Sequence, residues 1–141
     1  MSIIRFFKYN KSKKMTLESY WYAGLYRLSL VLIKPKRLRP YWGEEGRESP
    51  EDEIPQNYHQ AAHVGQIVNR YCNKTAWESK CLVRALTAQK MLSKRGIHTT
   101  LYLGCAMKEN KMVAHAWLRC GKMYVTGGDG EGYAIVDKFY K

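Results

Sequence analysis

The chain has 141 residues with a formal net charge of +12, and hydrophobic residues make up 45% of it. A chain of this length can bury one modest core, which excludes a second catalytic domain. The apolar stretch from Leu17 to Ile33 carries Glu18 and Arg27, and no small-residue cleavage site follows it, so we expect neither a secretory signal nor a membrane span and predict a cytoplasmic protein.

The basic charge is concentrated at the start of the chain. Residues 1–40 hold ten Lys or Arg against Glu18 alone. Such a segment attracts polyanions, and nucleic acid, anionic lipid or an acidic peptide would all satisfy it. A solvated basic face that only aids solubility is an equal alternative. Without a secretion signal, the four cysteines are expected to be reduced thiols.

In chain order, the first predicted element is a helix from Thr16, a plausible N-cap, to Lys34. Large apolar residues recur along it at spacings of four, four, three and four: Leu17, Trp21, Leu25, Leu28 and Leu32. Its other faces are also apolar, so we expect the helix to be buried. Packing against the core is the favoured explanation, with docking to a partner or to a membrane surface as the alternatives.

The next segment, from Gly43 to Pro55, has six acidic residues, two prolines and no hydrophobic period, which predicts a mobile connector. A helix over residues 56–72 should follow, although Gly65 weakens it. We therefore divide the chain into a basic helical segment (1–42), an acidic connector (43–55) and a compact domain (56–141).

Within residues 56–141 a further helix precedes a group of strands. The helix begins near Ser79 or Glu78, which suit its N-cap, and ends with Gly96 at the C′ position. The period then changes to two, which predicts strands over 97–106, 113–120 and 122–126 and a closing stretch over 133–139. The fold class is therefore α+β, with helices first and an antiparallel sheet after them.

Two residues give this layout its chemistry. Cys81 lies in the first turn of the predicted helix that ends with Gly96, where unpaired N–H groups stabilise a thiolate. His115 lies in a predicted strand, on the face that it shares with Val113 and Trp117. If that face packs over the start of the cysteine helix, the imidazole can deprotonate the thiol, and a third polar group would fix its tautomer.

The motifs around these two residues resemble one family. Trp77-x-x-x-Cys81-Leu-x-x-Ala-Leu, a helix ending in Arg-Gly, and then Ala-His115-Ala-Trp117 and Gly-Gly are similar to the transglutaminase-like leader peptidases of lasso-peptide biosynthesis. The resemblance implies a papain-like cysteine protease that removes the leader from a ribosomally made precursor. It also implies partners: the precursor, a separate leader-recognition protein and an ATP-dependent macrolactam cyclase.

The same resemblance makes Cys81 the nucleophile and His115 the base. An acidic third member is expected on the following strand, and we choose Asp129, with Asp137 as the alternative and an ordinary turn role for Asp129 nearly as plausible. Substrate-binding roles are predicted for Arg84, Trp77 and Trp117. For Arg84 a salt-bridged side chain, and for the two tryptophans plain packing, are the competing interpretations.

No cofactor, metal or nucleic acid is expected. His59 and His63 are spaced as a helical ligand pair, but no further ligands have an interpretable spacing. Two other functions remain open: a non-catalytic basic module that binds peptide or nucleic acid, and another Cys-His amide hydrolase or acyltransferase. The basic N-terminal helix is also a candidate for peripheral membrane contact.

Overall fold

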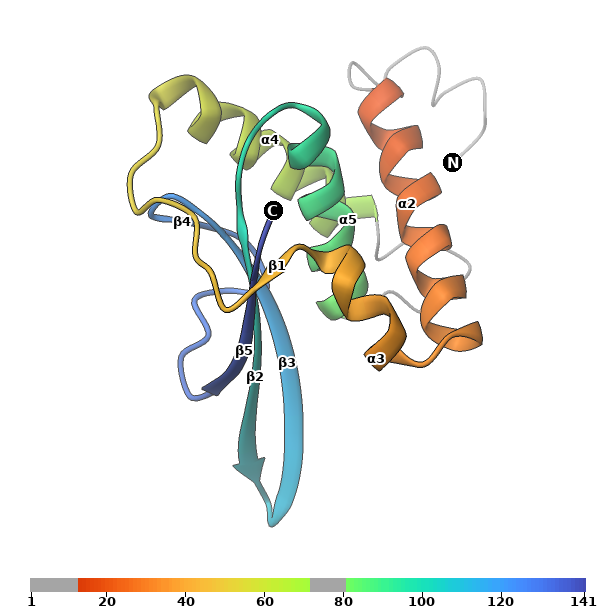
Figure 1. Ribbon diagram of the computed structural model, residues 1–141. Helices are drawn as coiled ribbons and strands as arrows, with labels where there is room; N and C mark the ends of the chain where they lie inside the picture. Colours follow the sequence, from red (N-terminus) through yellow and green to blue (C-terminus); the bar gives the residue numbers. More distant parts are fainter. Residues whose placement is uncertain (1–12, 72–80) are drawn as a thin grey trace.

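The structure, a computed structural model, describes residues 13–71 and 81–141. In these ranges the helices precede the main strands (Figure 1), and the predicted α+β class is confirmed. The helical elements are α2 (Lys13–Leu32), α3 (Pro35–Leu38), the 3-10 turn η1 (Arg39–Trp42), α4 (Pro55–Tyr71) and α5 (Cys81–Lys94). The strands are β1 (Glu44–Glu45), β2 (Thr100–Lys108), β3 (Lys111–Cys120), β4 (Met123–Thr126) and β5 (Ala134–Tyr140).

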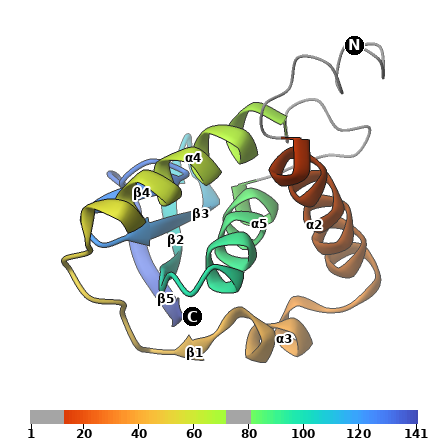
Figure 2. The same ribbon diagram turned by 90° about the horizontal axis from the view of Figure 1, so that it is seen from above.

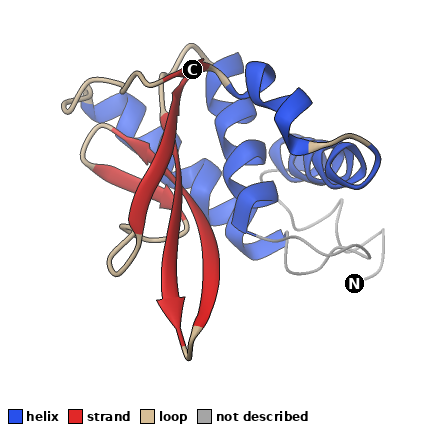
Figure 3. Ribbon diagram, turned by 60° about the horizontal axis from the view of Figure 1, so that its bottom comes forward, coloured by secondary structure: helices blue, strands red, loops and turns tan. Residues whose placement is uncertain are grey.

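The strands form one antiparallel sheet in the order β1-β5-β2-β3-β4. Helices α4 and α5 pack on one face of it, and α2 packs against α5 and α4 on the side away from the sheet (Figure 2). The β2–β3 hairpin extends beyond the helices (Figure 3). Its turn residues, Glu109 and Asn110, both have positive φ angles, of 51° and 63°. Such angles are typical of a tight two-residue hairpin turn, which here joins the two strands that the sequence predicts over 97–106 and 113–120.

Helix α5 runs through the centre of the core. Eight of its residues are buried: Val83, Ala85, Leu86, Thr87, Ala88, Gln89, Met91 and Leu92. It ends as the sequence predicts, with Gly96 at φ +74° and the Ile97 N–H donating to the Leu92 carbonyl at 3.0 Å. Gly65 on α4 has a packing role, because a Cβ there would lie 2.8 Å from the carbonyl oxygen of Val125. The glycine that weakens α4 locally thus lets it approach β4 closely.

The favoured explanation, that the large apolar stripe of α2 packs against the core, is wrong. The buried side chains of α2 are Thr16, Ser19 and Ala23, whereas Trp21 is 69% exposed and Leu32 is 71% exposed. Small residues bring α2 close to its neighbours, and Met15, Tyr22, Tyr26 and Leu30 pack partly buried against the core. The stripe of Leu17, Trp21, Leu25, Leu28 and Leu32 points outward. The helix is held by charge as well as by contact. Glu18 accepts two hydrogen bonds from the guanidinium of Arg95, at 3.0 and 2.9 Å, and so joins α2 to the end of α5.

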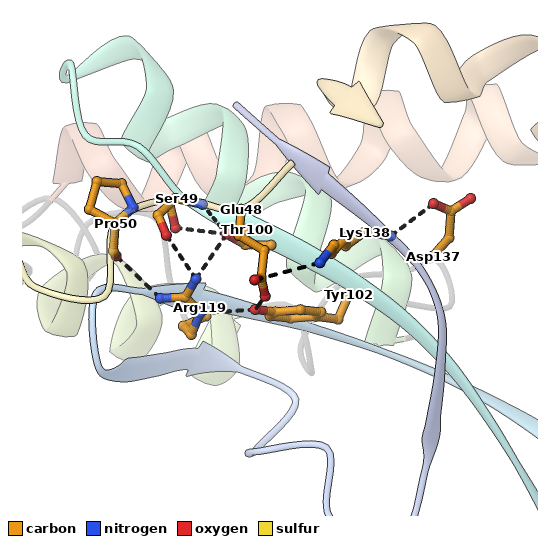
Figure 4. Close-up of polar contacts among 8 residues, drawn as sticks. All are labelled: Glu48, Ser49, Pro50, Thr100, Tyr102, Arg119, Asp137 and Lys138. Carbon is orange, nitrogen blue, oxygen red and sulfur yellow. Dashed lines mark hydrogen bonds and ion pairs between the residues drawn. The ribbon is translucent and has the colours of Figure 1, made fainter. Parts of the chain in front are cut away.

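The segment over residues 43–55 is tied to the sheet, contrary to the mobile connector that its composition predicts. Strand β1 pairs with β5, and Ser49 is buried with its N–H donating to the Thr100 hydroxyl at 2.7 Å. The guanidinium of Arg119 donates to the carbonyl oxygens of Ser49 and Pro50 at 3.0 and 3.2 Å (Figure 4). Hydrogen bonds to backbone carbonyls leave no hydrophobic period in the sequence, which is why the pattern missed this anchoring.

Candidate active site

A cleft of about 700 Å³ lies where the start of α5 meets the sheet. Its lining comes from α5, from strands β2, β3 and β5, and from the α3–η1 segment. The residues are Lys36, Arg39, Trp42, Cys81, Leu82, Leu103, Gly104, Cys105, Ala114, His115, Ala116 and Val136. Both residues predicted to carry the chemistry therefore line one cleft. Most of the other lining side chains are apolar, and the two cations come from α3 and η1.

Cys81 is the first residue of α5 and is half-buried. The first N–H groups of a helix have no partner within it and create a positive potential at this end of α5. Cys120 has the opposite environment. It is fully buried on β3, and burial, assisted by repulsion from Glu53, raises the pKa of its thiol to about 11.

His115 is held by a backbone acceptor. Its Nε2 lies 2.7 Å from the carbonyl oxygen of Gly127, in the loop after β4. A carbonyl oxygen carries no proton, so Nε2 must be the donor and hold the imidazole proton. In neutral imidazole the free lone pair is then on Nδ1, which is the atom able to accept a proton from a thiol. The ring also packs against Trp117 and Tyr133, with centroid separations of 5.8 and 4.8 Å.

The predicted packing of the His115 face needs a correction. Ala116 and Leu118 belong to the core that α5 completes, whereas Trp117 stacks on Tyr102 on the opposite face of the sheet. Helix α5 therefore covers the other face of β3. His115 still lines the cleft because it lies at a margin of the sheet: β4 pairs with Leu118–Cys120 and, in the described chain, not with the earlier part of β3.

Neither acidic candidate for the third catalytic position contacts His115. Asp129 is exposed, and its Oδ1 accepts a hydrogen bond from the Glu131 N–H at 2.9 Å, as an ordinary turn residue does. Asp137 lies on β5 and forms an ion pair with Arg39. The imidazole instead forms its hydrogen bond with the carbonyl of Gly127, a group that a search for acidic residues cannot find.

Of the three predicted substrate-binding residues, the two that the structure describes do not line the cleft. Trp77 lies outside the described residues. Trp117 is 2% exposed and packs against the ring of His115 without lining the cleft, and Arg84 is half-buried on α5 and is also not part of the lining. Lys36 and Trp42, which no motif in the sequence marks, do line the cleft. The Trp42 carbonyl accepts a hydrogen bond from Gln89 of α5 at 2.7 Å, and the Trp42 ring meets Phe139 edge-on.

Residues 13–71 and 81–141 show neither a metal-binding cluster nor a membrane-spanning helix. No group of three or more His, Cys, Asp or Glu side chains is arranged there to hold a metal ion. None of the helices in these ranges combines the length and the apolar character that crossing a membrane requires.

Comparison with known proteins gives the class of this fold and site. The profile of the transglutaminase-like superfamily matches residues 30–136, which is most of the chain. The protein therefore belongs to the transglutaminase-like superfamily, whose members are often cysteine proteases or amide hydrolases. No curated protein and no solved structure matches the chain.

Proposed function

We propose that this protein is a cysteine peptidase that removes the leader from a ribosomally made lasso-peptide precursor. The observation that carries the proposal is that Cys81 and His115 line one cleft, with Nε2 of the imidazole bonded to the Gly127 carbonyl. This arrangement leaves Nδ1 as the basic atom, as a thiol-activating histidine requires.

In the proposed reaction, Nδ1 of His115 takes the thiol proton and the Cys81 sulfur attacks the scissile carbonyl carbon. Backbone N–H groups at the start of α5 stabilise the negative oxygen that forms. As the C–N bond breaks, His115 gives its proton to the departing amine, and the acyl group remains on sulfur as a thioester. Water then attacks the thioester, releases the carboxylate and restores the thiol.

The cleft supports a peptide substrate. It is an open site, its lining is mostly apolar, and Lys36 and Arg39 lie at one side of it. Arg39 is already paired with Asp137 and Glu45, so Lys36 is the cation better able to meet an acidic group on the substrate. The choice of a leader as the substrate rests on the motifs around Cys81 and His115, and with it come the precursor, a leader-recognition protein and a macrolactam cyclase as proposed cytoplasmic partners.

The deciding experiment follows cleavage of a candidate precursor, in the presence of its recognition protein, by mass spectrometry. We expect Cys81→Ala to abolish cleavage and His115→Ala to lower the rate by about a hundredfold or more, the usual contribution of a general base. Cys105→Ala is the matched control, because Cys105 lines the same cleft without a place in the mechanism. Cleavage by the Cys81→Ala variant at the wild-type rate would exclude the proposal.

Asp129→Ala separates the two candidates for orienting the imidazole. If the Gly127 carbonyl holds the ring, this variant loses less than about tenfold in rate, because only a turn hydrogen bond to Glu131 is removed. A loss as large as that of His115→Ala would instead make Asp129 the third catalytic residue.

Another Cys-His amide hydrolase or acyltransferase is the second candidate, and it would use the same residues on a different acyl donor. Transfer to an added amine in preference to water would support it. A non-catalytic module that binds peptide or nucleic acid remains the third. It predicts unchanged binding of the precursor after Cys81→Ala and no cleavage by the wild type.

A further inference from the structure

The outward face of α2 and the residue after it carry seven of the fourteen exposed large apolar side chains in the described chain. These seven side chains are between 42% and 71% exposed: Leu17, Trp21, Leu25, Leu28, Val31, Leu32 and Ile33. At about 100° per residue, Leu17, Trp21, Leu25, Leu28 and Leu32 fall on one stripe of the helix. We call these five residues the α2 apolar face. Isolated exposed apolar residues are common, but a continuous stripe of this length marks a surface that binds something.

The α2 apolar face is also shaped for contact. Leu17, Trp21, Leu25 and Leu28, together with Tyr20 and Gly24, line a shallow groove along the helix. None of these residues lines the cleft that holds Cys81 and His115. Figure 2 shows why the face is open: α5 and α4 lie on one side of α2, and no described element lies on the other. The surface can therefore be altered without touching the candidate active site.

Basic residues lie at both ends of the α2 apolar face. Lys13 and Lys14 lie at the start of α2, and Lys34 and Arg37 follow its end. Glu18, the one acidic residue of α2, forms ion pairs with Lys94 and Arg95 at the end of α5. Hydrogen bonding to Arg95, with the charges of Arg95 and Lys94, outweighs burial and lowers the pKa of Glu18, so it stays paired at neutral pH. An apolar stripe with cations at both ends is the result.

The basic residues around the α2 apolar face indicate which kind of partner binds it. A second copy of a chain with a net charge of +12 would bring like charges together at both ends of the helix, which disfavours self-association. Nucleic acid would satisfy the cations but offers the apolar stripe no partner. An anionic lipid surface satisfies both, because the apolar side chains enter the boundary between headgroups and acyl chains while Lys and Arg meet lipid phosphates. Trp21 and Tyr20 suit that boundary, since each ring has an apolar body and a polar group.

We propose that α2 docks this protein onto an anionic membrane, lying in the plane of the surface with the α2 apolar face inserted. The helix does not cross the bilayer in this arrangement. This proposal is independent of the peptidase reaction, because the docking surface and the cleft share no residue.

The test is co-sedimentation of the full-length protein with vesicles of phosphatidylcholine alone and with vesicles of equimolar phosphatidylcholine and phosphatidylglycerol. The variant is Trp21→Ser with Leu28→Ser, both at exposed positions, and Met112→Ser is the control because Met112 is 73% exposed on the distant hairpin. Thermal unfolding of each protein checks that the fold is kept, and light scattering reports the oligomeric state.

We expect binding to the anionic vesicles that exceeds binding to the neutral ones and weakens at about 1 M salt, where the Debye length is about 3 Å. The double variant should bind the anionic vesicles at least about tenfold more weakly, since one large apolar side chain is enough for that factor, and Met112→Ser should bind like wild type. Equal binding by the double variant and the wild type would overturn the proposal. Absence of binding to anionic vesicles would also overturn it. So would a wild-type dimer that the double variant dissociates, because the α2 apolar face would then bind a second copy of the protein.

Discussion

The substitution Gly127→Ala tests whether the carbonyl of Gly127 orients the imidazole of His115. The φ of Gly127 is +76°, and a Cβ added there would lie 2.5 Å from the carbonyl oxygen of Ala116. Contacts of a Cβ below 3.0 Å are essentially never found in proteins, so Gly127→Ala must push the two segments apart by about 0.5 Å or more. The Gly127 carbonyl that accepts from His115 at 2.7 Å would move with its own residue.

Gly128→Ala is the matched control. Gly128 has nearly the same φ, +75°, but a Cβ there meets nothing within 4 Å. Both substitutions place alanine in the left-handed region, which costs about 1–2 kcal/mol of stability in each. Only Gly127→Ala also displaces the acceptor of the imidazole. Losing a hydrogen bond worth about 1–3 kcal/mol lowers kcat/KM by about tenfold to a hundredfold.

The assay measures kcat/KM for precursor cleavage and the melting temperature of both variants. We predict a loss of thermal stability in both variants, larger in Gly127→Ala because it adds a backbone clash, and a selective loss of activity in Gly127→Ala. Equal activity of the two variants would refute the orienting role of the Gly127 carbonyl. Both activities are measured well below the two melting temperatures, so that unfolding of the less stable variant does not account for a difference.

Three further predictions concern stability and reactivity. Glu18→Gln should destabilise the protein by about 1–3 kcal/mol at neutral pH in urea unfolding, because it breaks a partly buried pair with Arg95. The pKa of Glu18 is lowered in the folded state, so the difference from wild type should vanish as the pH falls below that pKa. Arg119→Lys should lower stability by about 2–4 kcal/mol and expose residues 43–55 to limited proteolysis, since the guanidinium bonds that hold this segment are lost. Cys120 should resist iodoacetamide at neutral pH, because a pKa raised from 9.0 to about 11 reduces its thiolate about a hundredfold.

Each of these has an outcome that counts against it. An exposed pair, Lys122 with Asp52, is the control for Glu18: Asp52→Asn should change stability by less than about 1 kcal/mol. A loss from Glu18→Gln that persists unchanged in acid would mean that lost packing, and not charge, is responsible. Unaltered proteolysis of residues 43–55 in Arg119→Lys would show that strand β1 alone anchors the segment. Rapid labelling of Cys120 would contradict its burial.

The sequence predicted most elements of the fold because local signals specify them. The period of two and Gly96 each act over a few residues, and the structure has strands β2 and β3 and the helix end close to where they indicate. The orientation of α2 was predicted wrongly. Periodicity shows that a stripe exists, but Thr16, Ser19 and Ala23 pack inward because their small size permits close approach, and that depends on the neighbouring helix.

Some residues of the site are marked by sequence motifs, and others are placed only by contacts between distant parts of the chain. Cys81 and His115 carry residue types and motif spacings that a sequence displays, and both line the cleft. The acceptor for the imidazole is a backbone carbonyl, which every residue possesses, so no residue type at Gly127 marks its role. Lys36 and Trp42 reach the cleft because η1 is held against α5 through Gln89, a contact between residues far apart in the chain.

The most direct test of the thiol–imidazole pair is the rate at which iodoacetamide alkylates Cys81 as a function of pH, in wild type and in His115→Ala. If His115 accepts the thiol proton, the wild type reacts at a pH well below the ordinary pKa of cysteine, and His115→Ala loses that acidic limb while keeping the alkaline one. Identical pH profiles in the two proteins would show that Cys81 and His115 do not share a proton, and the proposed mechanism would not stand.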